Sequence, residues 1–365
     1  TVDKLRALQY FVAAAEEGER LDVYLARRID GGVAAAQRRI AEGAVRIDGR
    51  PAKAAARLAA GAVVAVAAAA DAVPAALEAA PEIDLDIRWA DAAIVVVAKP
   101  AGLVVHPGLG HAGGTLVNAL VARFPDLAAA FGPDDPRPGL VHRLDADTSG
   151  LLVVARTPAV RAALQAQFKA RTVDKTYLVV VRGAPNAPYG LIDAPLGRDA
   201  AHRQRMAVVA GGRRAVTGYH VAASRPTDSL VVVRLFTGRT HQIRVHLAAI
   251  GHPVAGDRLY GRPDRDLGRM ALHAWRLALD HPTTGARLAL VAPPPDDLAA
   301  EIARRYGDGW PALTDASAAV LAEWPTPDAV AADAGGDDDG AWGAAADGDA
   351  GGDAGGAPGP TGDPS

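Results

Sequence analysis

The sequence predicts an α+β protein with two folded domains. At 365 residues the chain is longer than an average single domain, and half of its residues are hydrophobic. Runs rich in Val, Leu and Ile are interspersed with only a few helical segments, a mixed order that is typical of α+β folds. We expect strands at residues 94–98, 151–155, 176–181 and 230–235.

Composition divides the chain into five predicted segments. In order, they are a helical lead at 1–17, a small α/β module at 18–66, a linker rich in Ala, Pro and Glu at 67–82, the large domain at 83–307, and a tail at 325–365. The tail consists mainly of Ala, Gly, Asp and Pro, so it can bury too little apolar surface to offset the entropy of ordering. We expect it to be disordered.

The formal charge of −3 is unevenly distributed. Residues 326–365 contain nine Asp and no Lys or Arg, which leaves +6 on residues 1–325, and a basic body suits a polyanionic partner. The chain has no Cys, which excludes disulfides and thiolate metal sites and favours a reducing compartment. The longest apolar stretch, residues 58–70, is mostly alanine and too short to span a bilayer, and no secretory signal is evident. We expect a cytoplasmic protein with no membrane partner.

A helix in the large domain has a clear start. Thr157 has the residue type of an N-cap, and Pro158 suits the first helical position. The residues that follow carry an apolar stripe of Val160, Leu164 and Phe168 at helical spacing.

The module at 18–66 combines two helices with a hairpin. We expect helices at 19–28 and 37–43, the second ending at Gly43, and then a strand with an Asp48-Gly49 turn. Its arginines are candidate phosphate contacts: Arg27, Arg28, Arg38, Arg39, Arg46 and Arg50. The alternative is that these arginines form a solvated surface with no ligand.

The run from Gly139 to Gly150 (GLVHRLDADTSG) is the most informative part of the chain. It places the carboxylate of Asp145 in a polar loop between two strand-like runs, with Arg143 two positions before it. Loops that are held by rigid strands often carry catalytic groups. The alternative is an Asp that only bonds its own backbone in a turn.

The run from Phe236 to Leu247 (FTGRTHQIRVHL) is nearly as specific. Here a strand ends, Gly238 turns the chain, and Thr240 can cap a helix that runs to Ile250. The expected buried stripe of this helix is Ile243, Leu247 and Ile250. Arg244 lies at the edge of that stripe, from which it can point into a cleft.

Together these runs resemble the RluA/RluD family of RNA pseudouridine synthases, and the resemblance covers about residues 18–306. The segments at 97–108, 175–178, 251–261 and 272–274 also match the family, and we assign the last two mainly to the fold and the RNA path. The module at 18–66 resembles the S-four RNA-binding module, which often precedes this catalytic domain. Two departures stand out: Gly32, Val33 and Ala34 occupy the place of a usual Ser-Arg-Ser, and Ala146 replaces a usually basic residue.

The resemblance implies a catalytic domain with a mixed or antiparallel sheet and gives roles to individual residues. Asp145 would be the indispensable catalytic carboxylate, acting at the ribose as nucleophile or as base. Tyr177 would stack on the uracil and take part in removing its carbon-bound proton, and Arg244 would pair with Asp145. The residues expected to contact RNA in the large domain are Lys99, His142, Arg143 and Arg239, with Arg143 filling the space of the flipped base. In the first module they are Arg27, Arg38, Arg39 and Arg46.

The expected activity is therefore the isomerisation of uridine in RNA to pseudouridine by a monomer. The reaction needs no redox change or group donor, so we expect no cofactor, and the histidines suggest no metal site, since His241 and His246 are not spaced i, i+4. Large-subunit ribosomal RNA is the first expected substrate, with transfer RNA left open. A non-catalytic RNA-binding or ribosome-assembly factor is the alternative. A glycosidase is poorly supported, because Asp147 is too close to Asp145 to serve as an opposing acid.

Overall fold

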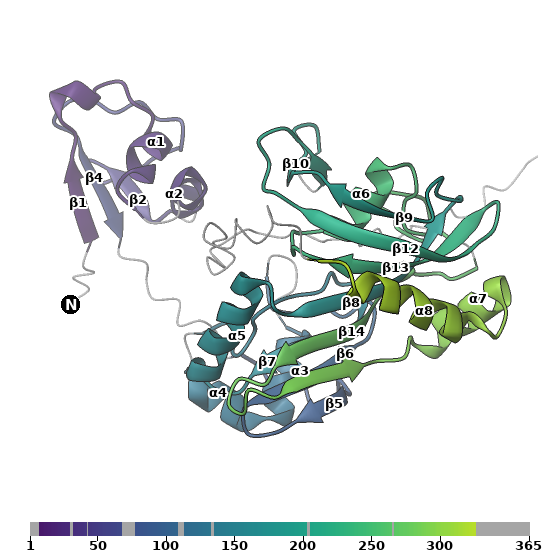
Figure 1. Cartoon of the computed structure of the whole chain (residues 1–365). Coiled ribbons are helices and arrows are strands. Elements are labelled where there is room, and N and C mark those ends of the chain that lie inside the picture. The colour runs from purple at the N-terminus through teal and green to yellow at the C-terminus, as the bar shows by residue number, and fades with distance from the viewer. Residues whose placement is uncertain are drawn as a thin grey trace, which may run out of the picture. The chain divides into compact units, whose positions relative to one another are not determined.

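The computed structural model describes residues 7–29, 32–41, 43–67, 77–108, 113–132, 135–202, 205–264 and 266–325. These residues form two compact units, 7–67 and the part from Leu77 onward (Figure 1). Most of the expected linker and nearly all of the expected tail lie outside the described residues, so both remain predictions.

The first unit is a four-stranded sheet with two helices. Its strands occur in the order β1-β4-β2-β3. Their bounds are β1 Ala7–Phe11, β2 Val45–Ile47, β3 Arg50–Pro51 and β4 Val63–Ala67, and the helices are α1 Leu21–Ala26 and α2 Gly32–Ala41, with a 3-10 turn at Ala14–Glu16. Asp48 and Gly49 both have positive φ, 48° and 79°, as a two-residue hairpin turn requires. The hairpin predicted from the sequence is therefore present.

The predicted helical lead is wrong, because Ala7–Phe11 forms strand β1 instead. β1 pairs antiparallel with β4, and Gln9 lies opposite Ala65. Such a short segment cannot sustain a helix alone, and the distant strand supplies hydrogen bonds that local sequence does not reveal.

The second unit is built on a mixed nine-stranded sheet, which confirms the predicted α+β class (Figure 1). The strand order is β5-β6-β7-β14-β8-β13-β12-β9, with β15 paired to β14, and the β14–β7 pair is parallel. The strands are β5 Asp86–Ala90, β6 Ile94–Lys99, β7 Ser149–Ala155, β8 Asp174–Arg182, β9 Tyr189–Asp193, β12 Val216–Ser224, β13 Asp228–Leu235, β14 Leu272–Asp280 and β15 Arg287–Val291. A separate hairpin consists of β10 Leu196–Arg198 and β11 Met206–Val208. The four strands expected from the sequence correspond to β6, β7, β8 and β13.

The sheet is buried on both faces. Alternate residues of β7 join different apolar clusters, Leu152 and Val154 on one face and Leu151 and Val153 on the other. The helices are α3 Leu116–Arg123, α4 Pro125–Phe131, α5 Pro158–Ala170, α6 Gln242–Ala249, α7 Asp296–Tyr306 and α8 Trp310–Ala322. Residues of α3, α4 and α6 pack in the cluster with Leu152, whereas α5 packs in the cluster with Leu151. In β8, Tyr177 faces the same side as α6.

Helix α5 begins as the sequence predicts. The Thr157 hydroxyl accepts a hydrogen bond from the Val160 backbone N–H, and Pro158 is the first helical residue. Val160 and Leu164 are buried, and Phe168 packs against the same cluster.

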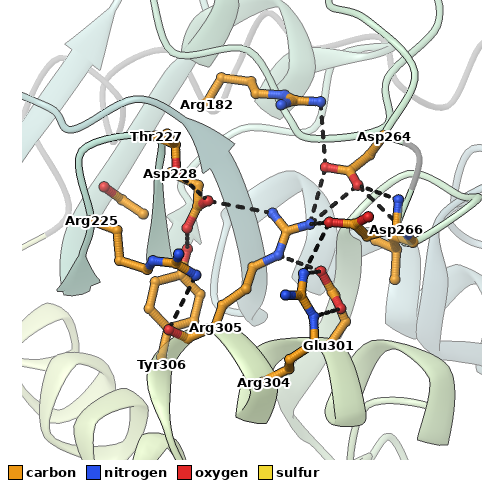
Figure 2. Close-up of polar contacts among 12 residues, drawn as sticks. Arg182, Arg225, Thr227, Asp228, Asp264, Asp266, Glu301, Arg304, Arg305 and Tyr306 are labelled. Atoms are coloured by element: carbon orange, nitrogen blue, oxygen red, sulfur yellow. Dashed lines mark hydrogen bonds and ion pairs between the residues drawn. The ribbon is translucent and has the colours of Figure 1, made fainter.

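Helix α7 is attached to the rest of the unit by a network of ion pairs centred on Arg305 (Figure 2). Its guanidinium contacts four carboxylates, with N–O distances of 2.5 Å to Glu301, 3.1 Å to Asp264, 3.7 Å to Asp228 and 4.0 Å to Asp266. The Asp228 carboxylate also accepts a hydrogen bond of 2.6 Å from the Tyr306 hydroxyl. Because Asp228 begins β13 and Asp264 lies in the segment between α6 and β14, the network joins three parts of the chain.

Among the described residues, no helix has both the length and the apolar character needed to cross a membrane.

Candidate active site

Asp145 lies in the loop that leads into β7. Its side chain is 16% exposed, and its backbone oxygen accepts a hydrogen bond from the Thr148 N–H at 3.1 Å, which closes a turn. Gly150 follows with φ 115°, and a Cβ there would lie 2.2 Å from the Ala274 oxygen. Only glycine therefore lets β7 enter the sheet directly after the loop at this close approach to β14.

Arg244, in α6, lies 99 residues further along the chain and forms an ion pair with Asp145. Its Nη1 donates to Asp145 Oδ2 at 3.0 Å, and the arginine side chain is 9% exposed. The structure thus brings together the two residues that the sequence resemblance paired.

The surroundings of Asp145 favour its ionised form. Burial alone would raise the pKa of this carboxyl, but the electrostatic attraction of His241, the charges of Arg244 and Arg143 and the Arg244 hydrogen bond outweigh burial and lower it. At neutral pH the site therefore holds a carboxylate, as either a nucleophile or a general base requires.

Tyr177 lies in β8, where its side chain is almost completely buried. Burial and the negative charge of Asp145 both raise the pKa of its phenol above the usual value. Its hydroxyl is therefore protonated at neutral pH, and the ring can stack on a base beside the carboxylate.

Lys99 is placed differently from what we expected. Its side chain is 1% exposed, and its ammonium donates to the backbone oxygens of Pro100, Leu103 and Ala146 at 2.7–2.8 Å. Burial lowers the pKa of Lys99 to about 7, against the opposing charges of Asp145 and Asp147. This placement does not fit the expected RNA contact, because the ammonium donates to three backbone oxygens inside the protein, and one of them belongs to Ala146, next to Asp145.

We expect the change Lys99→Met to impair catalysis by loosening this loop. Methionine fills a similar volume but leaves three buried carbonyl oxygens without the ammonium donor, a loss that costs about 1–3 kcal/mol for each buried polar group. The rate of uridine conversion should fall by more than tenfold, with RNA affinity changed by less than about threefold. Single-turnover kinetics and filter binding measure the two quantities, and unchanged kinetics would contradict the role of Lys99 in positioning Asp145.

Two other predicted RNA contacts also have internal partners. His142 Nε2 accepts a hydrogen bond from the Val153 N–H at 2.9 Å, and its ring stacks on Phe168. The Arg239 side chain is 9% exposed and its Nε donates to the Arg214 oxygen at 3.1 Å. Their contacts with RNA remain predictions, and so does that of Arg143, whose positive charge acts on Asp145.

The arginines of the first unit remain untested as RNA contacts. Arg27 is more than half exposed and forms ion pairs with Glu16 and Glu19, and Arg46 donates to the Gly49 oxygen. Arg39 is partly buried, and the side chain of Arg38 lies outside the described residues.

Sequence reasoning missed the role of Asp257. This fully buried carboxylate holds the Arg244 guanidinium with two hydrogen bonds, 2.7 Å from Nε and 3.0 Å from Nη2. It leaves Nη1 for Asp145, so Asp257 orients the arginine that binds the catalytic carboxylate. Gly256 precedes it with φ 77°, and a Cβ there would lie 1.9 Å from the Arg269 oxygen. The sequence did offer a signal, the Gly256-Asp257 pair within the family segment 251–261. A buried arginine needs a second anion, and Asp257 is that anion for Arg244.

The start of α6 also differs from the prediction. The N-cap is His241, with φ 56°, instead of Thr240, and the helix spans Gln242–Ala249. The Gln242 side chain is buried and accepts hydrogen bonds from the Arg239 N–H and the Thr237 hydroxyl, which anchors this turn. Ile243 and Leu247 are buried as expected, but Ile250 is 37% exposed because the helix ends before it.

Within the described part of the chain, no three His, Asp or Glu side chains are grouped so that they could hold a metal ion.

Comparison with known proteins agrees with this arrangement. Residues 93–249 match a family model described as RNA pseudouridylate synthase. The chain is 48% identical over 230 residues to a ribosomal large subunit pseudouridine synthase D of Nitrosomonas europaea, covering 60% of this chain and 65% of the relative. It is 48% identical over 228 residues to an uncharacterized RNA pseudouridine synthase of Bacillus subtilis, covering 62% and 75%, respectively. For the synthase D of Pseudomonas aeruginosa the identity is 46% over 232 residues, covering 60% and 71%.

The match covers three quarters of the Bacillus subtilis relative, at an identity that leaves little room for a different fold or core site. The chain therefore belongs to the RluA/RluD family of RNA pseudouridine synthases.

Proposed function

We propose that this protein converts specific uridines of large-subunit ribosomal RNA to pseudouridine. One observation carries the proposal: Arg244 holds the carboxylate of Asp145 at 3.0 Å in a largely buried site, near enough to the buried Tyr177 for its charge to raise the pKa of that phenol. A preorganised carboxylate beside an aromatic ring suits the cleavage of a glycosidic bond, with the base retained on the ring.

The reaction exchanges one bond of the base for another. The bond from N1 of uracil to C1′ of the ribose breaks, the base turns, and a bond from C5 to C1′ forms. C5 loses a proton and N1 gains one, so the product is an isomer and needs no external reactant. A target uridine inside a stacked helix must first be flipped out.

Each of the three residues has a defined task in this proposal. Asp145 acts at the ribose, either by attacking C1′ or by removing a proton from C2′, and both routes need the ionised carboxyl. Arg244 keeps that carboxyl in position, and Tyr177 stacks on the base, whereas its phenol, which is protonated at neutral pH, is not suited to accept the C5 proton.

Support for the substrate comes from the relatives. Two of the three carry names that assign them to the ribosomal large subunit. The chain spans 65–75% of the length of these relatives. Their names support large-subunit ribosomal RNA as the substrate that we propose for this protein. We propose further that the first unit binds RNA through its arginines, and that the protein acts as a monomer in the cytoplasm.

The decisive experiment measures tritium release. The full chain is incubated with unmodified large-subunit ribosomal RNA that carries tritium at uridine C5, beside an Asp145→Ala control. Release by the wild-type protein alone supports the proposal and allows the sites to be mapped. Release only from transfer RNA would change the proposed substrate, and no release from any RNA would favour the non-catalytic RNA-binding alternative.

A further inference from the structure

Tyr260 lies next to the catalytic residues, although the mechanism above does not use it. Its hydroxyl accepts a hydrogen bond from the Met206 N–H at 2.7 Å and lies 2.9 Å from Nδ1 of His241. Met206 is the first residue of β11, in the β10–β11 hairpin. The hydroxyl therefore connects this hairpin with the residue that begins α6.

These contacts favour one position for the proton of the His241 ring. Since the Tyr260 oxygen accepts from Met206, its own proton needs an acceptor, and within the described residues His241 Nδ1 is the acceptor in reach. A hydrogen bond from the hydroxyl to Nδ1 leaves the ring proton of a neutral imidazole on Nε2.

The protonated nitrogen faces the catalytic carboxylate. His241 Nε2 lies 4.0 Å from Oδ1 of Asp145, whereas Arg244 binds the other oxygen, Oδ2. A separation of 4.0 Å is too long for a hydrogen bond, so the imidazole acts on Oδ1 through its charge distribution. The Nε2–H form favours the carboxylate, and a lone pair at Nε2 would oppose it.

The backbone at His241 is strained in a way that fits this task. Its φ of 56° lies in the left-handed region, which is uncommon for residues other than glycine. Such strain persists where the surrounding structure imposes it, and it often marks a functional position. Here it puts the imidazole between Tyr260 and Asp145.

The Tyr260 ring adds a second link between the hairpin and the site. The Arg244 guanidinium carbon lies 5.1 Å from the ring centre, and that of Arg205, at the base of β11, lies 5.2 Å from it. Arg205 Nε is buried and has no hydrogen-bond acceptor among the described residues.

We propose that Tyr260 is a positioning residue for the uridine isomerisation proposed above: its hydroxyl fixes the ring proton of His241 on Nε2, toward Asp145, and ties that arrangement to the β10–β11 hairpin. The proposal rests on the proposed function for its kinetic consequence. Its structural part, the tautomer of His241, does not depend on activity.

The first test reads the tautomer directly, without substrate. Nitrogen-15 NMR of the histidine rings is recorded for the wild-type chain and for Tyr260→Phe, and the His241 signals are assigned by their loss in His241→Gln. We expect a neutral Nε2–H ring in the wild type and a shift toward the Nδ1–H or the doubly protonated form in Tyr260→Phe. An Nδ1–H ring or a doubly protonated ring in the wild type would overturn the proposal.

The second test is a double-mutant cycle on single-turnover kinetics with tritiated large-subunit ribosomal RNA. We expect Tyr260→Phe to lower the rate constant about tenfold while the RNA concentration for half-maximal rate changes less than twofold. In His241→Gln the amide can donate toward Asp145 without Tyr260, so the second change should then have little further effect. An equal loss in both backgrounds would show that Tyr260 does not act through His241.

A control at a second tyrosine, Tyr306, distinguishes a positioning effect of Tyr260→Phe on the rate from a general loss of stability. Tyr306→Phe also deletes one partly buried hydroxyl hydrogen bond, to Asp228, but far along the chain in the network of α7. It should lower the melting temperature and leave the rate within twofold of the wild type. If the wild type itself releases no tritium, the proposed function fails, and the NMR result still decides the role assigned to the Tyr260 hydroxyl.

Discussion

The Asp145→Asn variant is expected to lose pseudouridine formation by at least about 10³-fold while it still binds unmodified RNA. Asparagine keeps the size of the side chain but supplies neither a nucleophilic oxygen anion nor a base, and both candidate steps at the ribose require one. The amide oxygen can still accept the hydrogen bond from Arg244 at the same position. Binding should therefore change by less than about threefold, as measured by filter binding, whereas tritium release measures the loss of turnover.

The pH dependence of the wild type gives an independent check on the same carboxylate. The pKa of Asp145 is lower in the folded protein than its ordinary value, because the electrostatic attraction of His241 and the charges of Arg244 and Arg143 outweigh the effect of burial. The ionised form therefore persists through the whole neutral range, and activity that depends on it should fall only as the pH drops through this lowered pKa. If Asp145→Asn instead kept activity comparable to the wild type, Asp145 would not be the catalytic carboxylate.

Features of the fold that depend on local sequence could be predicted. The runs of Val and Leu in β6 and β7 are buried on both faces, and that burial produces a continuous apolar pattern without help from distant residues. Likewise, the Thr157 cap and Pro158 lie within one turn of α5. The pairing of Asp145 with Arg244 came from the family resemblance, since 99 residues separate them.

The failed prediction at β1, the unexpected burial of Lys99 and the missed role of Asp257 share one physical cause, which is dependence on partners far along the chain. β1 exists because β4 pairs with it. Lys99 is buried because carbonyl oxygens from two separate loops surround its ammonium, although a lysine at the end of a strand is usually solvated. Asp257 became a candidate only when Arg244 was seen to be buried and to need a second anion.

The Arg305→Met variant is expected to destabilise the second unit by about 3–5 kcal/mol, because it removes the cation from a buried group of carboxylates. The Arg305 side chain is 5% exposed, and its partners Asp264 and Glu301 are 4% and 10% exposed. Methionine fills the space but leaves these carboxylates with fewer counter-charges. Calorimetry should record a melting temperature about 10 °C lower for the transition of this unit.

Arg304→Met is the matched control for this effect, since the neighbouring residue undergoes the same change. Arg304 also contacts Glu301, at 2.6 Å, but its side chain is 56% exposed and solvent screens the pair. Its loss should therefore lower the melting temperature far less than the loss of Arg305 does. Equal losses from the two variants would mean that the network in Figure 2 stabilises α7 no more than surface ion pairs do. A large loss from Arg305→Met alone would show that the buried contacts of its guanidinium with Asp264 and Asp228, and not the pairing with Glu301 that both arginines share, stabilise α7.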